Sequence, residues 1–207
     1  MPAITLHYFN LAARGETIRL IFAAGGVDYK DLRYEQENWP TLKASGKFPF
    51  DQLPVLEVDG RLIGQSATIA RFAARLAGLA GKTSIEQAVA DQVADCFLHD
   101  LLDKFIAFTF EKDETKKEQI KTTYTTEIIP FYLGKLEKIL QENGGQYFAG
   151  SLTYADIAFY RFISVGISSL DLKPQPEKYP LLTGLYSRVK EIPGIKDWES
   201  RKPNTPF

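Results

Sequence analysis

The stretch from Phe50 to Ser66, FDQLPVLEVDGRLIGQS, constrains the fold most because it predicts several elements in a fixed order. Asp59–Gly60 is a strong signal for a two-residue hairpin turn. Apolar and β-branched residues flank that turn and predict strands at 55–58 and 61–63. We therefore expect an antiparallel hairpin followed directly by a helix.

The ends of this hairpin carry groups that suit a peptide ligand. Pro54 has no N–H and opens the first strand, so Leu53 before it is held extended with its own backbone groups unpaired. Gln65–Ser66 precedes the apolar run at 67–72, which places Ser66 at a helix start, where free N–H groups attract a carboxylate. Taken singly, each feature also fits an ordinary hairpin and helix cap. Together they predict a socket for a short peptide with a free α-carboxylate.

The motif QLPVLEVDG followed by GQS, with Tyr8 upstream, resembles the glutathione transferase family and in particular its sigma class, including prostaglandin D synthase-like members. The resemblance extends over nearly the whole chain. It implies a cis-proline before the third strand and glutathione as a co-substrate, with no permanently bound cofactor. It also implies alkyl or aryl transfer to the glutathione thiol.

The first part of the chain alternates between strand and helix patterns. We expect strands at 3–8 and 29–34, a helix from Glu16 to Gly25, and a short helical or irregular segment at 39–45. With the hairpin and the following helix, the order becomes β-α-β-α-β-β-α. This order predicts an α+β, thioredoxin-like domain with a mixed four-stranded sheet and helices on both of its faces.

The pattern changes after Leu76, where small residues form a joint and strand signals end. We place the glutathione-binding domain at 1–77, a linker at 78–82, and an all-α helical-bundle domain at 83–207 that lines the electrophile pocket. A long helix is expected from Thr83 or Ser84, with apolar positions at helical spacing: Ile85, Val89, Val93, Phe97, Leu101 and Phe105.

Four further features are predicted in the second domain. The mixed-sign run Glu111–Gln119 favours a solvated turn. The following helix is expected to kink at Pro130. Another helix spans Pro180 to Ile192, and Pro193–Gly194 ends it, after which Trp198 anchors a short last turn.

A capping box is predicted at Thr153. Its hydroxyl caps a helix start while Asp156, three residues on, reaches back, and Leu152 with Ile157 forms a hydrophobic staple. This is also a feature of the resembled family's second domain. We interpret the motif as a folding signal, not a catalytic one.

Composition excludes several functions. The 25 Lys and Arg residues balance 26 Asp and Glu residues, so neither nucleic acid nor an acidic membrane surface is an expected partner. Cys96 is the one cysteine, which excludes an internal disulfide and favours a packing role for its thiol. His7 and His99 form no metal-ligand spacing, so no metal is expected. No leader and no membrane span are expected, which predicts a cytoplasmic protein.

Tyr8 is the residue expected to activate the thiol. It closes the first strand beside Leu53 and Pro54, and a phenol that donates a hydrogen bond to a thiolate lowers the pKa of the thiol. Arg14, at a helix start, adds a fixed positive charge that helps to hold the thiolate. The alternatives are an aromatic residue flanking a strand and a solvated arginine.

Residue by residue, the resemblance implies a set of glutathione contacts: Tyr8, Arg14, Trp39, Lys43, Gln52, Leu53, Pro54, Gln65 and Ser66. Trp39 and Lys43 are one helical turn apart and are expected to share the glycine carboxylate of the tripeptide. Phe9, Phe105 and Phe162 are candidates for the electrophile pocket, and each also fits a core position.

Two positions concern a partner subunit. Related transferases dimerise through an aromatic residue inserted from the loop 46–49, so we expect a homodimer with Phe48 as its anchor. His99 falls where the family often has an acid that reaches across the dimer, and no role is assigned to it. The acid cluster that binds a divalent ion in vertebrate prostaglandin D synthases is not reproduced.

The expected function is conjugation of the glutathione thiolate to apolar electrophiles in a cleft between the domains. One alternative is isomerisation of a prostaglandin endoperoxide, with the thiol regenerated. A second alternative is a glutathione-binding structural protein, similar to the lens crystallins of this family.

Overall fold

The computed structural model describes residues 2–167, 170 and 177–205. The chain divides into two compact units. The first contains the residues up to Leu79 together with those from Ile192 onward, and the second contains Ala80–Glu191. Within the described ranges, no helix is both long and apolar enough to cross a membrane.

The first unit is built on a four-stranded sheet with the order β2-β1-β3-β4. β1 (Ile4–Phe9) pairs in parallel with β2 (Lys30–Tyr34) and antiparallel with β3 (Val55–Val58), which pairs with β4 (Arg61–Gly64). Both residues of the Asp59–Gly60 turn have positive φ, at 48° and 80°, as a two-residue hairpin requires. The predicted mixed sheet is confirmed.

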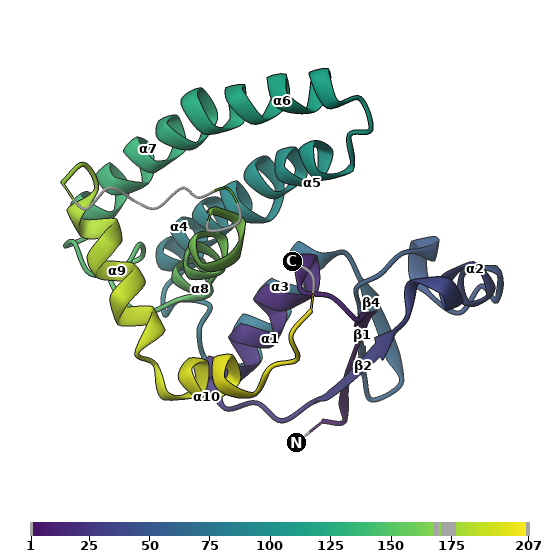
Figure 1. Ribbon diagram of the computed structural model, residues 1–207. Coiled ribbons are helices and arrows are strands. Elements are labelled where there is room, and N and C mark those ends of the chain that lie inside the picture. Colours follow the sequence, from purple (N-terminus) through teal and green to yellow (C-terminus); the bar gives the residue numbers. More distant parts are fainter. Residues whose placement is uncertain (1, 168–169, 171–176, 206–207) are drawn as a thin grey trace. The chain divides into compact units, whose positions relative to one another are not determined.

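Helices lie on both sides of this sheet (Figure 1). α1 (Ala13–Gly25) and α3 (Ser66–Leu76) run side by side against one face, and the short α2 (Trp39–Ala44) lies on the other side. Short 3₁₀ turns occur at Gln36–Asn38 and Pro49–Asp51. The core between α1, α3 and the sheet is fully buried and apolar: Leu6, Ile18, Leu20, Ile21, Phe22, Leu56 and Ile69.

The last helix, α10 (Pro193–Arg201), belongs to the first unit and packs against α1. Contact is close because Gly194 has no side chain, and a Cβ there would overlap the Ala23 carbonyl oxygen. The sequence predicted only a short last turn here, within a helical domain at 83–207. The structure instead returns this segment to the N-terminal unit.

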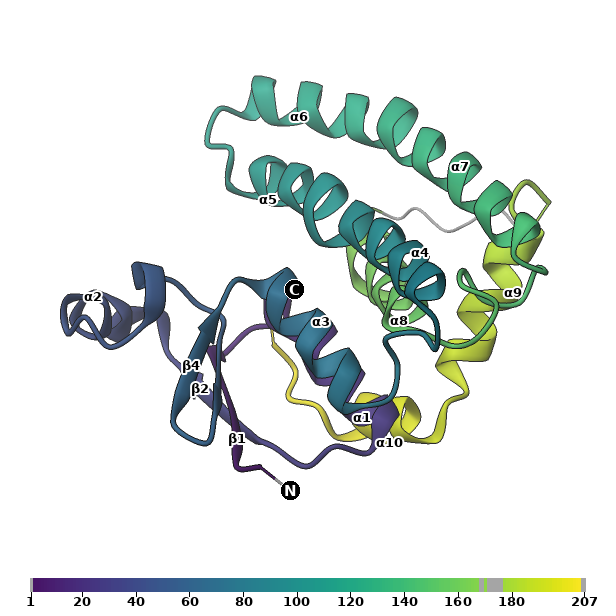
Figure 2. The same cartoon turned by 180° about the vertical axis from the view of Figure 1, so that it is seen from behind.

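The second unit is helical throughout its described elements (Figure 2). α6 and α7 form one nearly continuous rod, and α5 lies beside α6. The helices are α4 (Ser84–Asp95), α5 (Leu102–Phe110), α6 (Glu114–Thr123), α7 (Ile129–Glu142), α8 (Tyr154–Arg161) and α9 (Pro180–Lys190). Among the described residues, one π-helical turn joins α4 to α5 at Cys96–Leu101 and another joins α6 to α7 at Tyr124–Ile128. A further π-helical turn follows α8 at Phe162–Ile167.

Two local predictions in this unit need correction. The charged run predicted as a solvated turn is helical from Glu114 onward, because Asp113 Oδ1 accepts hydrogen bonds from the N–H groups of Thr115 and Lys116 and starts α6. Pro130 sits in the first turn of α7, where its missing N–H costs little. The helix is irregular just before Pro130 and not at it, because the π-helical turn Tyr124–Ile128 precedes α7.

Two predicted helix starts are confirmed. Thr83 Oγ1 accepts a hydrogen bond of 3.2 Å from the Glu86 N–H at the start of α4. At α8, the Thr153 N–H donates to Asp156 Oδ2 at 2.7 Å, and the capping box is complete. Asp156 is fully buried and also accepts from the Phe148 N–H at 3.0 Å.

Candidate active site

Three strand ends meet at one end of the sheet in the first unit: the end of β1, the start of β3 and the end of β4. We call this end of the sheet the edge at Pro54. The pairing of β3 with β1 and with β4 ends at Val55. Continuing both registers by one residue places Tyr8 on one side of Pro54 and Gln65 on the other. Pro54 has no N–H to continue either ladder, so this edge stays open for a ligand backbone.

The Leu53–Pro54 peptide bond at this edge is cis, as the family resemblance implies. Pro54 is buried, Leu53 is half-buried, and Gln52 before it is exposed. Among the described residues, no backbone hydrogen bond reaches Leu53. Its N–H and C=O are therefore available to an extended peptide.

Tyr8 is buried, and its hydroxyl lies at the N-terminus of α1. The Arg14 backbone N–H donates to Tyr8 Oη at 3.1 Å. No side chain of the preceding Ala12 caps α1, so the Tyr8 oxygen satisfies one of the unpaired N–H groups of the helix start. This contact uses a lone pair of the hydroxyl and not its hydrogen. The positive end of the helix dipole also favours negative charge at this place.

Gly15 allows the Tyr8 ring to lie against α1. A Cβ at Gly15 would overlap Tyr8 Cδ1 and would lie 3.0 Å from Cε1 and Cγ. The ring position therefore depends on a glycine in the first turn of the helix. Sequence reasoning treated the helix as starting later, at Glu16, and missed this contact.

Gln65 and Ser66 form the other side of the edge. Gln65 has φ 70° and ψ 112°, an uncommon backbone conformation for a residue other than glycine. Such strained residues gather at functional sites. Ser66 is the first residue of α3 and is buried, so its N–H belongs to the unpaired donors of a helix start. The helix start expected at Ser66 is therefore present, and its role in receiving a carboxylate stays a prediction.

Trp39 connects α2 to the same region. It is half-buried at the start of α2, and its ring meets Phe9 edge-on with 5.4 Å between centroids. Phe9 directly follows Tyr8 in β1. Lys43 lies one helical turn beyond Trp39 and is exposed, so both polar groups are carried by one short helix.

The three predicted electrophile-pocket residues lie in different units. Phe9 is half-buried in the first unit. Phe105 and Phe162 are buried in the helical unit, Phe105 beside Tyr124 and Phe162 beside Phe97. Their role in binding an electrophile stays a prediction.

The loop before Pro54 carries two aromatic residues with opposite environments. Phe48 is buried inside its own unit, with ring centroids 5.4 Å from His7 and 6.0 Å from Tyr34. The prediction that Phe48 reaches a second subunit does not agree with this burial. Phe50 is instead 74% exposed, with φ 58°.

The histidines and the cysteine have structural surroundings. His7 is buried between the Tyr34 hydroxyl at 2.8 Å and Glu57 at 3.0 Å, and burial lowers its pKa although the Glu57 hydrogen bond opposes this. Burial raises the pKa of the Cys96 thiol, and the nearby Asp100 and Asp95 add to this. Among the described residues, no three His, Cys, Asp or Glu side chains gather to hold a metal ion.

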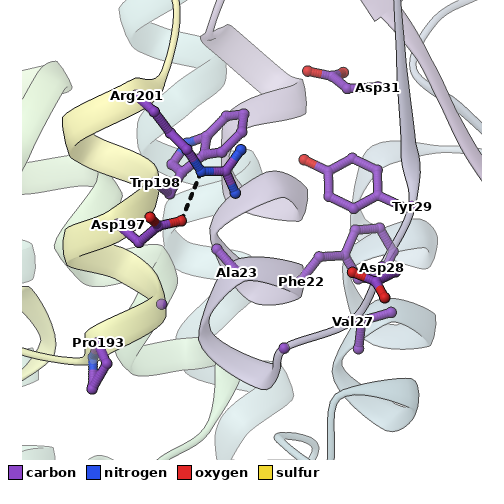
Figure 3. A pocket seen from close by; sticks show the side chains of 12 residues that line it. Phe22, Ala23, Val27, Asp28, Tyr29, Asp31, Pro193, Asp197, Trp198 and Arg201 are labelled. Carbon is purple, nitrogen blue, oxygen red and sulfur yellow. Dashed lines mark hydrogen bonds and ion pairs between the residues drawn. The ribbon is translucent and has the colours of Figure 1, made fainter.

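A separate cavity of about 600 Å³ lies in the first unit between the C-terminal end of α1, the following loop and α10 (Figure 3). Phe22, Tyr29 and Trp198 contribute to its walls, and Asp197 pairs with Arg201 at its rim. None of the predicted glutathione contacts lines it. The cavity is therefore distinct from the edge at Pro54.

The structure also reveals a fully buried arginine that sequence reasoning missed. Arg19 lies in the run Thr17–Phe22, whose other members after Thr17 are apolar. A single charge within such a run signals a paired, buried cation. Its partners come from distant parts of the chain, which the run itself does not reveal.

The four-stranded sheet, the cis-proline at its edge and the tyrosine beside it define a thioredoxin-like domain, which is followed by a helical one. Residues 4–75 match the glutathione S-transferase N-terminal domain, and residues 99–202 match the glutathione S-transferase C-terminal domain. The chain therefore belongs to the glutathione S-transferase family.

Full-length relatives agree with this assignment. The chain is 37% identical to glutathione S-transferase S1 of Drosophila melanogaster over 97% of its own length and 79% of the relative's. It is 38% identical to hematopoietic prostaglandin D synthase of Gallus gallus over 99% of both chains. A monomeric glutathione S-transferase from the hookworm Necator americanus superimposes with a TM-score of 0.87 at 30% identity, covering 99% of this chain and 100% of that one.

Proposed function

We propose that this chain binds glutathione at the edge formed by Tyr8, Pro54 and Gln65 and conjugates its thiolate to apolar electrophiles. Membership of the glutathione S-transferase family supports this function. The observation that carries it is the Tyr8 hydroxyl, which accepts a hydrogen bond at the N-terminus of α1 beside the open strand edge.

In the proposed reaction the protein ionises a bound thiol. Tyr8 donates its hydroxyl hydrogen to the sulfur, while the α1 N-terminus and the Arg14 charge add positive potential. The thiol proton leaves to solvent, the sulfur forms a new bond to the electrophilic carbon, and a leaving group departs or the carbon skeleton takes up a proton. Rate is gained from thiolate concentration and proximity, without a covalent protein nucleophile.

Recognition of the tripeptide divides among three elements. The backbone of Leu53 pairs with the extended cysteinyl residue, as in strand addition. The first turn of α3, with Gln65 and Ser66, receives the α-carboxylate of the glutamyl residue. The indole N–H of Trp39 and the ammonium group of Lys43 receive the glycine carboxylate.

Replacing Tyr8 by Phe tests the proposed role of the hydroxyl. This change removes one donor to the thiolate, so we expect conjugation turnover to fall by about 100-fold or more, with glutathione affinity changed much less. The ultraviolet absorbance of the bound thiolate should titrate closer to the value of a free thiol, near about 8.5. A variant with the turnover of the wild type would refute the role.

A second candidate is glutathione-dependent isomerisation of a prostaglandin endoperoxide. It is favoured by the 38% identity over 99% of both chains to the chicken hematopoietic prostaglandin D synthase. Product analysis with an endoperoxide separates this activity from conjugation. A chromogenic conjugation assay separates both enzymes from a glutathione-binding structural protein, which would bind without turnover.

We further propose a sigma-class enzyme of detoxification that acts in the cytoplasm as a homodimer. In this proposal the first unit supplies the glutathione site and the helical unit supplies electrophile contacts such as Phe105 and Phe162. Phe50 replaces Phe48 as the proposed dimer anchor, because an aromatic ring that is 74% exposed on a loop is available to a second chain.

A further inference from the structure

Arg19 is fully buried in α1, and its guanidinium donates to four acceptor atoms from three residues. Its Nη1 donates to Glu16 Oε2 at 3.0 Å and to the Leu11 carbonyl oxygen at 2.9 Å. Its Nε donates to both carboxylate oxygens of Asp31, at 3.1 and 3.2 Å. These hydrogen bonds fix the directions of the Nε and Nη1 groups, and therefore the orientation of the planar guanidinium.

The remaining nitrogen, Nη2, is buried and has no hydrogen-bond acceptor among the described residues. The guanidinium carbon of the same side chain lies 5.7 Å from the centroid of the Tyr8 ring. The face of a phenol is electron-rich and attracts a cation within about 6 Å. The guanidinium as a whole therefore lies within cation–π range of the Tyr8 ring, and this attraction offsets part of the cost of burying it.

α10 fixes this arrangement from the far end of the sequence. Trp198 Nε1 donates to Glu16 Oε1 at 2.7 Å, which leaves Glu16 Oε2 for Arg19. Asp31 is held in turn by the Arg33 Nε at 2.8 Å. The guanidinium is thus placed against Tyr8 by groups from α1, β2 and α10.

We infer that Arg19 is a positioning residue whose buried positive charge stabilises the ionised form of Tyr8 and so makes its hydroxyl a stronger donor to the thiolate. This inference rests on the proposed function of Tyr8. Burial matters because a charge that solvent does not screen acts more strongly on its neighbour. The other charged groups around Tyr8 and Arg19 are Glu16 and Arg14 on α1 and Asp31 and Arg33 on β2.

A purely structural role is the competing explanation, in which Arg19 only neutralises Glu16 and Asp31. The two roles differ in what they predict for the Tyr8 hydroxyl. A structural arginine affects unfolding but leaves the pKa of Tyr8 unchanged in variants that fold. A positioning arginine shifts that pKa in the direction of its charge.

The test compares three variants that all carry Glu16→Gln, because a Gln oxygen still accepts the Trp198 hydrogen bond. One has no other change, one adds Arg19→Met, and one adds Arg19→Lys. The Met variant removes the cation, and because residue 16 is then a neutral Gln, no unpaired buried charge is left there. The Lys variant also loses the planar guanidinium and its hydrogen-bond geometry, but it keeps the positive charge.

The readout is the pKa of Tyr8 in the ligand-free protein, followed by NMR of tyrosine labelled with carbon-13 at Cζ and assigned with Tyr8→Phe. We expect the Arg19→Met change to raise this pKa by about half a unit to one unit, with the Lys variant close to the Glu16→Gln reference. Equal pKa values in the Met and Lys variants would overturn the inference. This measurement needs no glutathione, so its result does not depend on whether the proposed function is correct.

A second change covers the case in which the Met variant does not fold. Asp31→Asn removes an anion from beside Arg19 at a partly exposed position, so it should lower the pKa of Tyr8, and an unchanged or raised value contradicts the inference. With glutathione bound, the Arg19→Met change should reduce the thiolate fraction at neutral pH by about three- to tenfold. That reduction should vanish in a Tyr8→Phe background, and a reduction that persists there would show that Arg19 does not act through Tyr8.

Discussion

Gly15 determines where the Tyr8 ring can lie. A methyl group at this position would overlap the ring, and the ring cannot withdraw without moving its hydroxyl from the Arg14 N–H. Gly15→Ala should therefore cost about 1–3 kcal/mol of unfolding free energy and lower conjugation turnover by about tenfold or more. Denaturant unfolding and steady-state kinetics measure the two effects.

Gly134→Ala is the matched control for this change. Gly134 also lies within a helix, α7, but a Cβ there would meet no atom within 4 Å. Alanine is the better helix former, so stability should stay the same or rise by up to about 1 kcal/mol, with normal turnover. If both variants lose activity equally, the steric contact with Tyr8 is not the cause.

Residues whose structural role depends only on their own chemistry and that of their sequence neighbours were predictable from the sequence. Pro54 ends a ladder because it has no N–H, and Ser66, the second residue of the polar pair Gln65–Ser66, starts a helix. By contrast, Phe48 and Phe50 are two positions apart in one loop, and only the folded backbone decides which is buried. Phe50 combines a positive φ with an exposed ring, and the sequence carried no signal for either.

At the scale of elements, the capping box at the start of α8 contains a side chain that can titrate, the carboxyl group of Asp156. Burial raises the pKa of Asp156 to about 6, against four hydrogen bonds that favour its ionised form. A folded-state pKa above the unfolded value of about 3.9 means that the folded protein binds the proton more tightly. The stability contributed by this protonation is complete below about pH 4 and is lost as pH rises through about 6.

Comparison with Asp156→Asn isolates this contribution, because the amide does not titrate. Between pH 4 and pH 7 the unfolding free energy of the wild type should fall relative to that of the variant, by up to about 3 kcal/mol. Chemical denaturation of both proteins across this range provides the measurement. A gap that stays constant with pH would contradict the raised pKa.

The elements themselves were predicted unevenly. The hairpin and the capping box were correct because each depends on a few neighbouring residues. The run at 111–119 was expected to be a turn because its charges balance, whereas the Asp113 side chain caps α6 and Lys117 lies near Glu114 on the same helix. The π-helical turns have no comparable local signature, since packing of the flanking helices decides them.

At the scale of the whole molecule, the proposed homodimer gives a prediction for Phe50. Phe50→Ser should reduce the sedimentation mass at low micromolar concentration from two chains toward one, because an aromatic anchor carries a large share of binding energy. Phe110→Ser is the control, since Phe110 is 68% exposed and lies in the helical unit. A dimer that persists in the Phe50 variant, or that is lost equally in both, argues against this anchor.

The division of the chain was the least predictable feature. Helical periodicity identified a helical second part correctly, but it does not reveal that α10 returns to the first unit. That return depends on Gly194 meeting Ala23 and on Trp198 meeting Glu16, contacts between residues that are far apart in the sequence.

The hydrogen bond between Trp198 and Glu16 joins residues that are 182 positions apart in the sequence. Proteolytic cleavage between α9 and α10 would therefore leave every strand of the sheet intact but would release the helix that donates to Glu16. The buried arginine would then keep the Asp31 and Leu11 acceptors and lose the indole that orients its Glu16 partner.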